Sequence, residues 1–228
     1  MIALVRILLR GDAEEIECWL GAFDLRKAAN CASIVLLGCG IYGATIGIWR
    51  APLQAGFTAL KFPLLILLTC AGNALLNGIL AQLLGSRLSF RQTSLAILLS
   101  FATAAVVLGA LSPVTLFVIC NAPPLGSVRA GVGHSITLLM HVFLIAYAGI
   151  IGNHRLFQLL ARMTADRGAA RRVLVSWLGG NLLLGAQLAW VLRPFIGSPS
   201  IAVQFLRDDP LRGNFYEAVW HTLAQLLS

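Results

Sequence analysis

The chain has 228 residues, of which 58% are hydrophobic and only 11% are charged. A soluble domain has about 25% charged residues, so this chain has too few polar side chains to cover a water-exposed surface. The composition excludes an ordinary soluble protein and predicts an all-α, polytopic membrane helical bundle. The net charge is +8, but the basic residues mostly flank apolar runs, so we attribute them to membrane orientation and expect no nucleic-acid partner.

Residues 1–30 are predicted to form a cytoplasmic amphipathic segment. In the opening stretch, MIALVRILLR, the arginines follow the apolar residues, whereas a cleaved signal places its positive charges first. We therefore expect this stretch to be retained. Asp12 and Glu15 have the spacing of a helix capping box. The apolar residues behind them share one helical face and comprise Ile16, Trp19, Leu20 and Phe23.

Five apolar runs follow, each long enough to cross a bilayer, which takes about 20 helical residues. They cover residues 31–49, 62–84, 93–120, 132–151 and 173–191, within a predicted five-helix transmembrane domain of residues 31–192. Lys61 is expected just outside the second run, at the headgroups, with Pro63 in the first helical turn. Pro113 is expected to kink or divide the third run. The connection after the fourth run is long enough for a short surface helix.

The counts of arginine and lysine predict the orientation of these runs. With a cytoplasmic amino terminus, eleven of the 17 basic residues lie in cytoplasmic segments and six in external ones, which supports an external carboxyl terminus. The cytoplasmic residues are Arg6, Arg10, Arg26, Lys27, Arg87, Arg91, Arg155, Arg162, Arg167, Arg171 and Arg172. The external residues are Arg50, Lys61, Arg129, Arg193, Arg207 and Arg212.

The first apolar run is rich in small side chains. In GCGIYGATIG, residues 38–47, Gly43 and Gly47 form a GxxxG pair, Cys39 continues the ridge and Gly40 widens it. Because lipid is as apolar as leucine, helices in a bilayer associate through close packing, which small residues allow. We therefore predict a tight helix–helix contact along these four residues. A substrate-facing groove and self-association are the alternatives.

Several polar side chains fall within the apolar runs. They are Asn73, Asn77, His134, His141, Asn181 and Gln187. An amide in hydrocarbon needs a partner, and we interpret these amides as interhelical hydrogen bonds rather than as a polar path. Both histidines are interpreted as packed or hydrogen-bonded, because no carboxylate lies in any run to complete a proton relay.

No catalytic, cofactor-binding or metal-binding residue is predicted. The cysteines have no ligand spacing and are interpreted as small hydrophobes, namely Cys18, Cys31, Cys39, Cys70 and Cys120. Serines and threonines in the runs have no nearby base, and acidic residues are few. We therefore expect neither an enzyme nor a bound cofactor.

Residues 193–228 are predicted to form an external tail that ends in an amphipathic helix. Asn214 can cap this helix. The apolar face of the helix is a candidate surface for a protein partner and comprises Phe215, Val219, Leu223 and Leu226.

The five-span layout, with a cytoplasmic amino terminus and an external carboxyl terminus, resembles the Yip superfamily of small multi-pass proteins. The stretches YGATIG, LKFPLLILLT and WVLRPFIGSP are similar to motifs in bacterial membrane proteins near that superfamily. The resemblance covers about residues 31–199. It implies a scaffold or adaptor in membrane organisation or trafficking, and a bacterial cytoplasmic (inner) membrane location.

We therefore expect a non-enzymatic membrane scaffold or adaptor that binds lipids or another membrane protein, or that self-associates. The alternative is a small transporter or channel with a polar path along Asn73, Asn77, His141 and Asn181. A dry, packed bundle favours the first function, and a wet cavity lined by these residues favours the second.

Overall fold

The computed structural model describes residues 2–21, 24–83, 89–163, 167–197 and 202–217. Within these residues the chain forms seven helices and no strand, which confirms the predicted all-α fold. The helices are α1 (Ile2–Arg10), α2 (Ala13–Leu20), α3 (Leu25–Ile48), α4 (Pro52–Leu83), α5 (Phe90–Asn121), α6 (Ala130–Met163) and α7 (Arg167–Val191).

Among the described residues, five helices, α3 to α7, are long and apolar enough to cross a membrane. Each predicted apolar run overlaps a different one of these helices over most of its length, in chain order. The chain is therefore an integral membrane protein built as a helical bundle.

Short polar side chains begin several of these helices, because the first backbone N–H groups of a helix have no partner within it. The Asp24 carboxylate accepts a hydrogen bond from the Arg26 N–H at 2.9 Å at the start of α3. Ser89 and Gln92 form a reciprocal capping box at the start of α5. The predicted cap at Asp12 is present, although its carboxylate accepts from the Glu14 N–H, at 3.0 Å.

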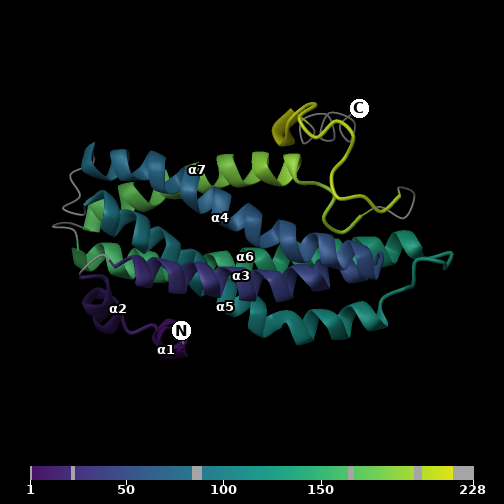
Figure 1. Cartoon of the computed structure of the whole chain (residues 1–228), viewed down its shortest axis with the longest axis horizontal. Coiled ribbons are helices and arrows are strands. Elements are labelled where there is room, and N and C mark those ends of the chain that lie inside the picture. The colour runs from purple at the N-terminus through teal and green to yellow at the C-terminus, as the bar shows by residue number, and fades with distance from the viewer. Residues whose placement is uncertain (1, 22–23, 84–88, 164–166, 198–201, 218–228) are drawn as a thin grey trace.

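The bundle is organised around α3, which packs along both α4 and α5. Helix α6 packs on α5 and α7 packs on α4, whereas α6 and α7 contact each other less. Figure 1 shows the long helices side by side, with α1 and α2 at one end and the chain after α7 returning over the other. The fully buried side chains of Val35, Tyr42 and Ala105 mark the core between α3 and its neighbours.

Two helices are longer than the sequence predicts. Helix α4 begins at Pro52, so Lys61 and Pro63 lie inside it rather than at its start. Helix α6 continues to Met163 through the stretch expected to be a connection. Helix α5 is continuous through Pro113, so the third span is one helix and is not divided.

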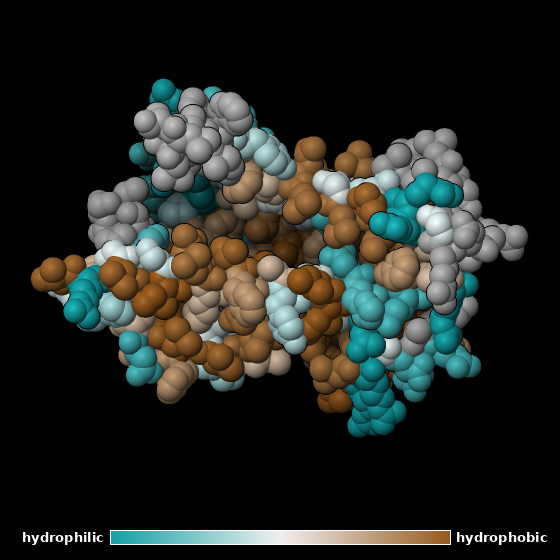
Figure 2. All heavy atoms as spheres, turned by 180° about the vertical axis from the view of Figure 1, so that it is seen from behind, coloured by the Kyte–Doolittle hydropathy of each residue, from teal (hydrophilic) through white to brown (hydrophobic). Residues whose placement is uncertain are grey.

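The outer surface of the bundle is apolar over a wide band. Figure 2 shows hydrophobic side chains across the middle of one face, which is hollowed near its centre, and hydrophilic side chains gathered towards the ends. Large apolar side chains of α6 and α7 are exposed, among them Leu139, Phe143, Ile150, Leu182 and Leu183. This distribution suits helices that face lipid.

Candidate functional site: the segment after α7 and its arginine hollow

The small residues of α3 lie where this helix approaches its neighbours most closely. A Cβ atom added at Gly43 would lie 2.6 Å from the Thr58 carbonyl oxygen, and one added at Gly47 would overlap the backbone of Gln54. Gly40 lies less tightly, with 3.6 Å between such an atom and the Ala59 carbonyl oxygen. The Cys39 side chain is buried in the same region. These positions therefore allow α3 and α4 to meet backbone to backbone.

The two histidines of α6 make different contacts. The buried His141 ring forms a hydrogen bond of 2.9 Å between its Nδ1 and the Tyr42 hydroxyl of α3. Its Nε2 has no hydrogen-bond partner among the described residues. The half-buried His134 ring lies 5.8 Å from the ring of Trp49, whose indole N–H donates to the Pro123 carbonyl oxygen at 3.1 Å.

Two members of the predicted polar path, His141 and Asn73, lie far apart along the bundle. The Phe62 ring lies 5.8 Å from that of Tyr42, the partner of His141. The buried Asn73 side chain is eleven residues further along α4, which corresponds to roughly 16 Å of helix. Asn181 is half-buried on α7, and the side chain of Asn77 lies outside the described part of the chain.

Lys61 is fully buried and lies within α4, so the prediction that it precedes the second membrane helix is wrong. Its ammonium group donates hydrogen bonds to the carbonyl oxygens of Pro194 and Phe205, the second at 2.7 Å. The same nitrogen lies 5.4 Å from the ring centroid of Phe195 and 5.3 Å from that of Phe205. Carbonyl oxygens and aromatic faces thus take the place of water around this charge.

Two further residues of α4 bind the same part of the chain. We call this part, the described residues 192–197 and 202–217 after α7, the returning segment. The Gln54 side-chain amide donates to the carbonyl oxygens of Pro194 and Phe195, at 3.0 and 2.7 Å. The Thr58 hydroxyl lies 2.8 Å from the Phe195 carbonyl oxygen. Gln54, Thr58 and Lys61 have the spacing of one helical face, a signal present in the sequence but missed because this stretch was interpreted as an external loop. We call these three residues the α4 polar stripe.

The chain beyond this point lies along α7. The Trp190 indole N–H donates to the Arg212 carbonyl oxygen at 3.1 Å, and the Tyr216 hydroxyl donates to the Leu182 carbonyl oxygen at 3.2 Å. Gln187, predicted to bond to a neighbouring helix, accepts from the Phe215 N–H at 3.1 Å, where the predicted tail helix begins.

The start of the predicted tail helix is present. Residues 215–217 are helical, and the Asn214 side chain accepts from the Glu217 N–H at 2.8 Å, as expected of a cap. Phe215 is 40% exposed. The other three members of the predicted partner-binding face, Val219, Leu223 and Leu226, lie outside the described residues.

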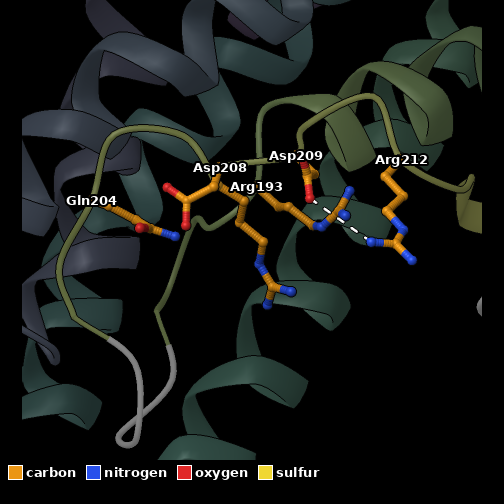
Figure 3. A pocket seen from close by; sticks show the side chains of 6 residues that line it. Arg193, Gln204, Asp208, Asp209 and Arg212 are labelled. Carbon is orange, nitrogen blue, oxygen red and sulfur yellow. Dashed lines mark ion pairs between the residues drawn. The ribbon is translucent and has the colours of Figure 1, made fainter.

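A hollow of about 300 Å³ opens between the end of α7 and this returning segment. Its lining residues are Arg193, Gln204, Arg207, Asp208, Asp209 and Arg212. Figure 3 shows the labelled side chains around it, with an ion pair of 4.0 Å between Asp209 and Arg212. We call this space the arginine hollow.

Arg193 is held in a defined position at the edge of the arginine hollow. Its guanidinium carbon lies 3.5 Å from the ring centroid of Trp190, and its Nη1 donates to the Trp190 carbonyl oxygen at 2.6 Å. Burial, together with the positive charge of Arg207, lowers the pKa of Arg193 from its usual value. The arginine hollow is thus a place where positive charges are held close together.

Within the described residues, no group of three histidine, cysteine or acidic side chains is placed to hold a metal ion. Comparison with known proteins finds no matching family model, no matching curated protein and no matching solved structure. The resemblance to the Yip superfamily therefore stays a prediction.

Proposed function

We propose that the chain is a non-enzymatic scaffold or adaptor of the bacterial inner membrane, as the Yip-like resemblance implies, which binds another membrane protein or lipids. The observation that supports this proposal is that buried polar side chains form hydrogen bonds to other parts of the same chain. The α4 polar stripe holds the returning segment, and Tyr42 holds His141. These groups join parts of the protein to one another, as expected of a rigid scaffold.

The arrangement supports an adaptor over a transporter. A polar path would need the side chains of Asn73, His141 and Asn181 to follow one another through the bundle. None of these three residues lines the arginine hollow, the hollow beside α1 and α2, or the groove between α6 and α7. His141 is instead bonded to Tyr42, roughly 16 Å along the bundle from Asn73, so the two side chains do not follow one another directly.

The groove between α6 and α7 is the surface that best suits a partner. It encloses about 430 Å³, and apolar side chains such as Ile150, Phe157 and Leu174 dominate its lining. Gly149 also lines it, and a Cβ atom added there would meet no other atom within 4 Å. A glycine beside open space in a membrane helix allows the backbone of another helix to approach. We therefore assign this groove to a transmembrane helix of a partner protein.

The test is to fill the groove without disturbing the bundle. Gly149→Leu places a side chain in the open space of the groove. Gly179→Leu makes the same change on the exposed surface of α7, where an added Cβ also meets no atom within 4 Å. We expect the parent protein and Gly179→Leu to copurify with the same membrane protein in mild detergent and Gly149→Leu to lose it. The same partner set for all three proteins would contradict the assignment.

A further inference from the structure

The arginine hollow lies at the depth of the lipid headgroups. The α7 span ends at Val191, and Arg193 follows two residues later. Trp190, on which Arg193 stacks, is a residue type enriched at membrane–water interfaces. The backbone next to Arg193 is fixed in turn, because Gln54 binds the Pro194 and Phe195 carbonyl oxygens. The Arg193 side of the hollow is therefore fixed in position at the bilayer surface before any ligand binds.

The charges in the hollow are only partly balanced. Asp209 pairs with Arg212. Neither Arg193 nor Arg207 forms an ion pair within the described residues, although both line the same space. The buried Nε of Arg193 also has no hydrogen-bond partner among these residues. Two guanidinium groups that line one space and form no ion pair there favour an anion, and their planar donor sets suit the oxygens of a phosphate.

The composition of the hollow also indicates the charge of that anion. Three arginines and two aspartates line it, which leaves a net charge of +1. A phosphodiester carries one negative charge, which balances this excess, whereas a phosphate monoester carries about −1.5 to −2 at neutral pH and exceeds it. Asp208 is exposed on the same rim and is available to an amine or hydroxyl beside the phosphate.

We propose that the arginine hollow binds the phosphodiester headgroup of a phospholipid, with Arg193 and Arg207 as its phosphate ligands. The acyl chains lie along the adjoining apolar flank of α7, where Leu182 and Leu183 are exposed. This inference rests on the lipid-binding form of the proposed function and names its site. It uses residues outside the groove between α6 and α7, so the test of the groove and the test of this site can fail independently.

The experiment uses the purified full-length protein in detergent, titrated with phosphatidylglycerol and examined by native mass spectrometry. We expect the parent protein to retain the lipid, and the double variant Arg193→Gln, Arg207→Gln to bind it about tenfold or more weakly, because hydrogen bonds to charged groups are lost. The single variant Arg207→Gln is also measured, since Arg207 is exposed and its replacement leaves the fold intact. It should show a smaller loss in the same direction.

Two controls distinguish a phospholipid site from a general surface charge effect and from a site for a free anion. Arg129→Gln removes one exposed charge from the loop between α5 and α6, at the same end of the bundle, and should leave lipid binding unchanged. Excess inorganic phosphate should fail to displace the lipid. Equal binding by the parent and the arginine variants would overturn the proposal. So would an equal loss with Arg129→Gln, which indicates the charge effect, or displacement by inorganic phosphate, which indicates the free anion.

Discussion

Lys61 is the residue whose environment departs most from what the sequence around it indicates. It directly precedes an apolar run, which predicts a lysine at the membrane surface. Its hydrogen-bond partners, the carbonyl oxygens of Pro194 and Phe205, lie 133 and 144 positions later in the chain. No local pattern reports such distant contacts, so the burial of Lys61 could not be predicted from the neighbouring residues.

Replacing Lys61 by methionine tests what its ammonium group does. Methionine keeps an unbranched apolar side chain but donates no hydrogen bond, so the returning segment should be held less firmly. We expect amide hydrogens of residues 202–217 to exchange about tenfold faster or more, because the charge-assisted hydrogen bond to the Phe205 carbonyl oxygen is lost. Hydrogen-exchange mass spectrometry in detergent measures this change.

The free energy of global unfolding should change little in the Lys61→Met variant. Burying an ammonium group is itself costly, and this cost offsets much of what its hydrogen bonds contribute. Arg129→Met is the matched control, because it removes a positive charge at the same end of the bundle without touching the segment. Unchanged exchange of residues 202–217 in Lys61→Met would show that the ammonium group does not hold the segment.

The elements of the fold show which helix features are local and which are not. Asp12 and Asn214 could be predicted as caps because a cap depends on residues two or three positions away. The carboxyl end of α6 could not, because distant contacts stabilise it. There the Arg155 guanidinium donates to the Gly11 carbonyl oxygen at 2.7 Å, and Leu159 is buried near Ile16.

The contact between α3 and α4 can be tested with two matched glycine substitutions. Gly43→Ala places a methyl group 2.6 Å from the Thr58 carbonyl oxygen, so the helices must separate. We expect it to lower the free energy of unfolding by about 1–3 kcal/mol, as overpacking does in well-packed cores. Unfolding by sodium dodecyl sulfate in mixed micelles measures this free energy.

Gly56→Ala is the control for helix propensity. It lies on α4, where an added Cβ meets no atom within 4 Å, so alanine should raise the free energy of unfolding by up to about 1 kcal/mol. The opposite signs of the two effects are the expected result. Equal effects at Gly43 and Gly56 would contradict a close backbone contact at Gly43.

At the scale of the whole molecule, composition and apolar runs were sufficient to predict five membrane helices and their order. The candidate sites could not be predicted from the sequence. The arginine hollow combines the end of α7 with residues 204–212, and the groove combines α6 with α7, so each depends on how the helices pack. The predicted orientation rests on charge counts and stays a prediction.

The most direct test of the five-span bundle uses two cysteines of the protein itself. Cys18 and Cys120 are exposed, whereas Cys31, Cys39 and Cys70 are buried. Three spans, α3 to α5, separate Cys18 from Cys120, so the two thiols must lie on opposite sides of the membrane. The measurement is labelling by a membrane-impermeant maleimide in sealed, right-side-out vesicles, with Cys18→Ser and Cys120→Ser variants to assign the label. We expect Cys120 to react from outside and Cys18 to react only after permeabilisation; reaction of both thiols from the same side would contradict the fold and the functions proposed on it.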